Sequence, residues 1–181
     1  MKVGMCMFLW TTHVTGEHEA LMRDIRATGF DGVEIPIFDG EPDHYARLGA
    51  LLDEIGLERT AVSAMGDPSM NLIGDRAERA AGIAYMTRVI DCAAALGATR
   101  LSGPLHSTLG RFSGEGPTSE ERARSAASQR TIGDHAENRG VVVGLDGGRP
   151  GRSLVLAGHP ETVARLEAIL APTGVGNRSG E

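Results

Sequence analysis

The stretch Gly29–Ile37 reads Gly-Phe-Asp-Gly-Val-Glu-Ile-Pro-Ile, and it joins the end of a helix to a short apolar strand. Glycine tolerates the left-handed conformation in which many helices end, and the apolar run that follows is too short to be another helix. The same junction recurs at Gly56, Gly97 and Gly140, each of which precedes a short apolar run. With an opening strand at 2–9, these junctions predict the order β-α-β-α-β-α-β-α-β. That order is typical of an α/β fold, in which helices cover a parallel sheet.

The elements between the junctions follow from hydrophobic periodicity and capping residues. We expect strands at 33–36, 57–64, 99–103 and 141–145, and helices that begin after Thr15 and at about 42, 75 and 118. The last of these helices, which ends near 138, has an apolar face made mostly of alanine, so we expect it to be the most loosely packed. Beyond Asp146, we expect a short strand at 154–157, a helix at 160–170 and a disordered tail at 172–181.

Composition limits the classes of partner. The chain has 181 residues, 41% hydrophobic residues and a formal net charge of -6, without a basic stripe, which argues against nucleic acid and anionic membranes. No apolar run approaches the ~20 residues that span a bilayer. Cys6 and Cys92 have no metal-type spacing, and we expect both to be reduced. These features favour a small-molecule ligand and a cytoplasmic location.

Polar residues fall where the predicted strands end, and in parallel α/β folds the chemistry gathers at those ends. They are Trp10 to His13 after the first strand, Glu34 within the second, His106 after the fourth and Asp146 after the fifth. A carboxylate inside a buried strand costs about several kcal/mol unless it is paired, so Glu34 either faces a wet pocket or has a structural partner. His106 is also open to interpretation as an ordinary loop histidine, and His13 more so, because Thr11-Thr12-His13 forms a loop of its own. Asp146 is open to interpretation as a cap or an Asp-Gly turn. Phosphate-loop, nucleophile-elbow and paired metal-ligand motifs are absent.

Four stretches, taken as an ordered set, resemble the sugar isomerase and epimerase superfamily with the xylose isomerase-like barrel, and most closely its ketose 3-epimerase branch. They are Phe8–His13, Gly29–Pro36, Gly103–Ser107 and the approach from Ala136 to Asp146, and the resemblance covers about residues 1–146. It implies a (β/α)8 barrel that binds a divalent cation, Mn²⁺, Co²⁺ or Mg²⁺. In such a barrel, carboxylates on either side of a ketose carbon move a proton through an enediolate while the metal acts as a Lewis acid.

The resemblance also implies roles for single residues. Asp146 takes the position of the family's first metal-binding carboxylate, so it is the expected metal ligand and, with Glu34, a catalytic residue. The residues expected beside the sugar are Cys6, Trp10, His13 and His106. The three other metal ligands of the family have no counterpart after Asp146, and a complete barrel takes ~250 residues. We therefore expect a partial barrel of about five βα units, with residues 147–171 as a divergent strand and helix segment.

Two functional hypotheses and a second fold stay open. The first hypothesis is a metal-dependent sugar isomerase or epimerase; the alternative is a truncated, non-catalytic α/β module that binds a small polyol or a partner protein. The second fold is an open doubly wound sheet with a hairpin from Val141 to Ala157. An incomplete barrel would leave a sheet edge exposed, which predicts a homo-oligomer or association with another chain.

Overall fold

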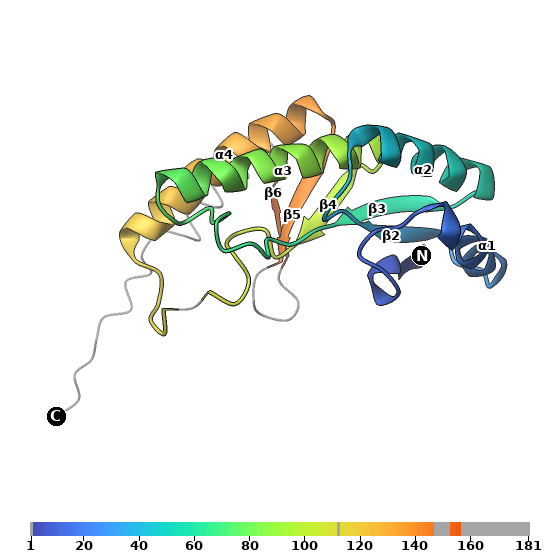
Figure 1. Ribbon diagram of the computed structural model, residues 1–181, viewed down its shortest axis with the longest axis horizontal. Helices are drawn as coiled ribbons and strands as arrows, with labels where there is room; N and C mark the ends of the chain where they lie inside the picture. Colours follow the sequence, from blue (N-terminus) through green and yellow to red (C-terminus); the bar gives the residue numbers. More distant parts are fainter. Residues whose placement is uncertain (1, 112, 147–152, 157–181) are drawn as a thin grey trace.

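The computed structural model of the protein describes residues 2–111, 113–146 and 153–156 (Figure 1). The predicted helix at 160–170, the tail at 172–181 and most of the divergent segment 147–171 lie outside the described residues, so these predictions stay untested.

Six strands form one sheet in the order of the chain. They are β1 (Gly4–Cys6), β2 (Gly32–Pro36), β3 (Glu58–Val62), β4 (Arg100–Gly103), β5 (Val142–Asp146) and β6 (Ser153–Leu156). Neighbours from β1 to β5 are parallel, as predicted, whereas β5 and β6 pair antiparallel. The antiparallel pair expected of the doubly wound alternative is thus present. A doubly wound sheet also requires the strand order to reverse, and the order of these strands does not reverse. The winding is that of a partial barrel.

Four helices connect the parallel strands: α1 (Glu19–Ala27), α2 (Pro42–Ile55), α3 (Arg76–Leu96) and α4 (Ser119–Asn138). Figure 1 shows α2, α3 and α4 lying along the same face of the sheet. The outward side chains on that face are almost fully buried: Val33, Ile35, Ala61, Leu101, Val143 and Leu145. Since side chains alternate along a strand, the intervening residues of β2, β3 and β4 point to the opposite face.

The predicted helix-to-strand junctions are confirmed. Gly29, Gly56, Gly97 and Gly140 all have positive φ, and Gly56 and Gly97 are left-handed C-caps of α2 and α3. At the other end of α3, Asp75 Oδ1 accepts hydrogen bonds from the backbone of Ala77 and Glu78, while Glu78 bonds back to the Asp75 N–H. This reciprocal cap fixes where α3 begins.

The first strand is shorter than predicted. Only Gly4–Cys6 pairs with β2, and Met7–Leu9 forms a 3-10 helix (η1). The expectation of a strand at 2–9 is therefore wrong before Gly4 and beyond Cys6. The backbone N–H groups of Trp10 and Thr11 both donate to Met7 O, which turns the chain away from the sheet. Met7 is fully buried. The Met7 side chain therefore packs in the core although its backbone forms a turn. The hydrophobic pattern of the sequence does not reveal this.

Helix α4 packs through small and polar groups. Its buried residues are Ser128, Gln129, Ile132, Gly133 and Ala136. Ser128 Oγ donates to Leu72 O at 2.9 Å, and Gln129 Nε2 donates to Leu105 O at 3.0 Å. These bonds attach α4 to the two long loops that follow β3 and β4. The predicted alanine face is wrong in its residues: Ala136 is buried, but Ala123 and Ala127 are exposed. Among the described residues, no helix is both long enough and apolar enough to cross a membrane.

Candidate functional site

The face of the sheet opposite the helices carries a row of polar side chains. The register pairs Cys6 of β1 with Glu34 of β2, and Glu34 with Thr60 of β3. Pro36 pairs with Val62 and Val62 with Ser102, which places Ser102 of β4 on the same side. Paired residues of parallel strands point the same way, so Cys6, Glu34, Thr60 and Ser102 share one surface, which we call the polar face. All four side chains are half-buried.

Glu34 lies at the centre of the polar face. Ser102 Oγ donates to Glu34 Oε1 at 3.5 Å, a long hydrogen bond that crosses the intervening strand β3. On the other side, partial burial raises the pKa of the Cys6 thiol, and its hydrogen bond to Glu34 raises that pKa further. Glu34 also lines a cavity of about 470 Å³ that reaches to Lys2 and Arg100 near the starts of the strands. Glu34 therefore has both a structural partner and an open pocket.

Ser102 was not among the residues singled out from the sequence. A lone serine in a short strand carries no signal of its own, because its relevance depends on which residue lies across β3. The register supplies that link, since it brings two residues together that are 68 positions apart in the chain.

His106 follows β4 and lies in a second cavity. Gly103 has φ +142°, and a Cβ there would overlap Ser63 O, so only glycine lets the chain pass at this point. The cavity, of about 860 Å³, lies between the two long loops and the starts of α3 and α4. The His106 side chain is exposed to this cavity, yet the surrounding loops desolvate it and lower its pKa. The imidazole is therefore neutral at pH 7 and can both donate and accept a hydrogen bond.

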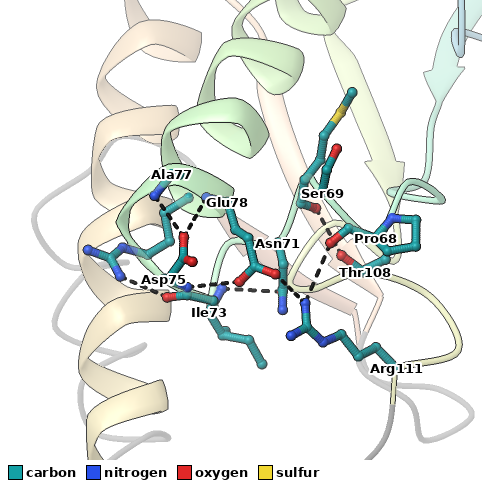
Figure 2. Close-up of polar contacts among 12 residues, drawn as sticks. Pro68, Ser69, Asn71, Ile73, Asp75, Ala77, Glu78, Thr108 and Arg111 are labelled. Carbon is teal, nitrogen blue, oxygen red and sulfur yellow. Dashed lines mark hydrogen bonds and ion pairs between the residues drawn. The ribbon is translucent and has the colours of Figure 1, made fainter.

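The walls of this second cavity are held by a polar network (Figure 2). Arg111 Nη1 pairs with Glu78 Oε1 at 2.6 Å, and Thr108 Oγ1 donates to Met70 O at 2.9 Å. The Arg111 guanidinium and the Asp75 backbone hold the pKa of Glu78 below its usual range. The network ties the loop after β4 to the start of α3. Because His106 and Glu34 line different cavities, the described residues do not form one compact site from all the predicted positions.

Trp10 and the ring pair Phe8–Phe38 belong to the segments that follow β1 and β2. Trp10 and Phe8 are each 50% exposed, and the rings of Phe8 and Phe38 lie 5.3 Å apart. We call Phe8, Trp10 and Phe38 the aromatic rim. Phe8 and Trp10 lie two and four residues after β1, and Phe38 lies two residues after β2. The rim therefore borders the end of the sheet at which parallel α/β folds bind their ligands.

His13 contacts helix α2 instead of the polar face. Its ring stacks on His44 with centroids 4.5 Å apart, and its backbone forms an antiparallel bridge with Ile37. His44 in turn lies 2.9 Å from Val14 O through its Nε2. His13 Nδ1 is buried and has no hydrogen-bond partner among the described residues. These contacts give His13 a packing role, and its predicted role beside the sugar stays a prediction.

Asp146 is the last residue of β5, and its side chain is exposed. Its register with Ser153 and that of Gly144 with Ser102 place it on the side of the polar face. Within the part of the chain that the structure describes, no three His, Cys, Asp or Glu residues gather into a set that could hold a metal ion. A catalytic metal site needs at least three protein ligands in most enzymes. The described residues therefore do not fit the divalent cation that the family resemblance implies.

Comparison with known proteins agrees with the fold. A family model described as "Xylose isomerase-like TIM barrel" matches residues 22–155. The ketose 3-epimerase of Arthrobacter globiformis is 29% identical over 173 residues, which make up 95% of this chain and 60% of that protein. The L-ribulose 3-epimerase of Methylomonas sp. is 30% identical over 132 residues, or 72% of this chain and 45% of that protein.

A solved structure shows the same fold. The crystal structure of D-allulose 3-epimerase from Methylomonas sp. in complex with D-allulose superposes with a TM-score of 0.73 at 21% identity. The superposition covers 94% of this chain and 59% of that one. The chain therefore spans less than two thirds of the length of each of these relatives.

Proposed function

Because the chain belongs to the xylose isomerase-like TIM barrel family, we propose that it carries the sugar-binding part of a ketose epimerase or isomerase site. The observation that carries the proposal is the Glu34 carboxylate. It is half-buried on the polar face, lies beside Cys6 of β1 and accepts a hydrogen bond from Ser102 of β4. A carboxylate in that setting is a strong acceptor for the hydroxyl groups of a polyol.

The polar face and the aromatic rim suit the two kinds of surface on a sugar. Glu34 and Ser102 offer hydrogen bonds to hydroxyl groups, whereas Phe8 and Trp10 offer apolar surface to the C–H face of the ring. We assign Trp10, His106 and Cys6 to the substrate side of the site. Cys6 acts there through Glu34, and His106 acts as a neutral hydrogen-bonding group at the neighbouring cavity.

Epimerisation requires a proton to leave one face of a carbon beside the carbonyl and another proton to reach the opposite face. A carboxylate within hydrogen-bond reach of that carbon takes the first proton, which leaves an enediolate, and a second acid returns one. We assign these two roles to Glu34 and Asp146, which belong to β2 and β5 and lie on the same side of the sheet. Ser102 keeps one Glu34 oxygen occupied and thereby orients the other toward a ligand.

A divalent cation, when bound, would polarise the sugar's oxygen atoms as a Lewis acid. Asp146 is the ligand that we assign to it, but a single carboxylate does not make a metal site. Any further ligands would have to come from outside the described residues, so the steps above are derived from the protein's own groups.

We also propose that the chain associates with a second copy or another chain through a sheet edge, and that it lies in the cytoplasm. In the described sheet, β1 pairs on one side with β2 only, which leaves an edge that can pair with another chain. Cys6 and Cys92 are free, in keeping with the reducing cytoplasm. Size-exclusion chromatography with light scattering checks the association.

Trp10 is the only tryptophan, so the tryptophan fluorescence comes from a single position of the aromatic rim. Titration with D-fructose should change its emission saturably, and Glu34→Gln should weaken that binding at least tenfold. Glu137→Gln, an exposed change on α4, is the matched control and should bind as the unaltered chain does. Conversion of the ketose is followed by chromatography of the products. Binding without conversion would favour a non-catalytic polyol-binding module, and no binding would contradict the proposal.

The metal assignment has a separate test. A ligand that binds only the folded state stabilises it by ~2.7 kcal/mol at a hundredfold excess over its dissociation constant. Thermal melts with and without Mn²⁺ therefore test whether ligands from outside the described residues complete a site around Asp146: an upward shift that Asp146→Ala abolishes would show that they do. Equal midpoints in all four samples would contradict the assignment of Asp146 as a ligand.

A further inference from the structure

Side-chain hydrogen bonds hold the whole turn that follows β2. Residues 37–40 present four consecutive backbone carbonyls, and a side chain donates a hydrogen bond to each. The pairs are Ser63 Oγ to Ile37 O (2.6 Å), Arg88 Nη2 to Phe38 O (3.3 Å), Tyr45 Oη to Asp39 O (2.6 Å) and Arg88 Nη1 to Gly40 O (2.8 Å). Carbonyls in connecting segments usually bond to water, which leaves such segments mobile. Here protein donors replace water along the whole turn.

Arg88 is the central donor of this arrangement. Its guanidinium bonds to two of the four carbonyls and lies 5.4 Å from the centre of the Tyr85 ring. Tyr85, one turn earlier on α3, donates to Ala64 O, and its hydroxyl oxygen lies 2.9 Å from Ser63 Oγ. Among the described residues, no carboxylate pairs with Arg88. Carbonyl dipoles and an aromatic ring stabilise its charge, so the turn and Arg88 depend on one another.

The turn connects two parts of the candidate site. Glu34 precedes it by three residues on β2, and Phe38 within it supplies one ring of the aromatic rim through its contact with Phe8. A displacement of the turn would therefore move Phe38 away from Phe8. Since loop carbonyls without donors would fall back on water, the position of this ring depends on the donors from α2 and α3.

We propose that Arg88 is a positioning residue for the sugar site: from α3 it fixes the turn 37–40 and thereby the aromatic rim on which a ketose packs. This inference rests on the proposed function. Arg88 belongs to the helix-covered face of the sheet and acts only through the backbone of Phe38 and Gly40. Its effect on a ligand is thus indirect, and it needs no contact with the sugar.

Cys92 provides a local reporter of the turn. Its side chain is fully buried on α3, one turn beyond Arg88, with Sγ 3.7 Å from Gly40 O. Burial raises the pKa of this thiol to about 11. Both features make Cys92 slow to alkylate while the turn is in place. Opening of the turn exposes the thiol, and mass spectrometry of the alkylated peptides distinguishes it from Cys6.

The experiment compares Arg88→Met and Arg88→Lys with Arg47→Met, an exposed substitution on α2 that serves as the matched control. Two quantities are measured on each folded chain: the iodoacetamide alkylation rate of Cys92 and the affinity for D-fructose from Trp10 fluorescence. Arg88→Met should raise the alkylation rate at least tenfold and weaken D-fructose binding at least fivefold. Arg88→Lys retains a cation but only a single donor group, so both quantities should lie between those of the unaltered chain and those of Arg88→Met. If Arg88→Met does not fold, Arg88→Lys alone provides the comparison.

The outcomes separate the inference from the function on which it rests. Faster Cys92 alkylation with unchanged D-fructose affinity would overturn the positioning role, as would wild-type values of both quantities. If the unaltered chain does not bind D-fructose, the proposed function fails and the sugar-positioning role falls with it; the Cys92 rates then show only whether Arg88 fixes the turn. Equal effects of Arg47→Met and Arg88→Met would show a general loss of stability and would also overturn the inference.

Discussion

The two faces of the sheet use the same strands for different purposes. On the helix-covered face, Ile35 and Leu101 are fully buried against helices. On the polar face, their immediate neighbours Glu34 and Ser102 are half-buried and bonded to each other. Because side chains alternate along a strand, one step in sequence changes a residue from core to candidate site. Stability and chemistry can therefore be altered separately within a single strand.

The sharpest test of this contrast uses adjacent residues of β4. Leu101→Ala removes a fully buried side chain and should lower the free energy of unfolding by about 2–5 kcal/mol, because a cavity is left. Ser102→Ala removes one long hydrogen bond on a half-buried face and should cost at most about 1 kcal/mol. Urea unfolding measures both. Equal losses would show that the two faces do not differ as the burial pattern indicates.

A second test concerns the attachment of helix α4, and it compares a buried with an exposed side chain of that helix. Ser128 of α4 is buried, and its Oγ donates to the carbonyl of the fully buried residue Leu72. Ser128→Ala leaves that carbonyl without its donor and should cost about 1–3 kcal/mol in urea unfolding. Thr131→Ala is a control two turns from the end of α4, since the Thr131 side chain is exposed. A neutral Ser128→Ala would mean that α4 is not attached through this bond.

On the polar face, the thiol of Cys6 reports the state of Glu34. Burial is the largest cause of the raised Cys6 pKa, and the hydrogen bond and charge of Glu34 raise that pKa further. Glu34→Gln removes the charge, so the Cys6 pKa should fall toward its ordinary value without a comparable loss of stability. The pH dependence of Cys6 alkylation measures the shift. An unchanged or higher pKa would contradict the contact between the two side chains.

The smallest effect concerns the helix caps, which lie away from both faces. Backbone hydrogen bonds from Glu78 and Ala77 hold the pKa of Asp75 below its usual range, and bonds from Thr118 do the same for Glu121. A lowered pKa in the folded state contributes stability that is present above the unfolded value of about 4 and is lost as pH falls through the folded value. Thermal midpoints should thus decline gently below pH 4. Asp75→Asn retains a capping side chain and should flatten the decline; an identical profile would exclude this contribution.

Local signals in the sequence accounted for most of the fold. The glycine C-caps at Gly56 and Gly97, the helix start at about 75 and the short apolar strand at 33–36 are short-range features, and each has the structure that it predicts. The first strand is the exception, since Met7 reaches the core from a 3-10 turn. Hydrophobic residues mark burial, but they do not distinguish a strand from a turn that buries the same side chain.

The sequence by itself determined the order of strands and helices, the family, and the presence of polar groups such as Glu34, His106 and Asp146 near the strand ends, because periodicity, capping and motif spacing are local properties. Only the tertiary structure decided which of them meet. It paired Glu34 with Cys6 and Ser102, placed His106 in a separate cavity, packed His13 on His44, and brought Arg88 to the turn after β2. These contacts join residues that are 28 to 68 positions apart. They depend on sheet register and helix packing, in which a shift of one residue would send each side chain to the opposite face.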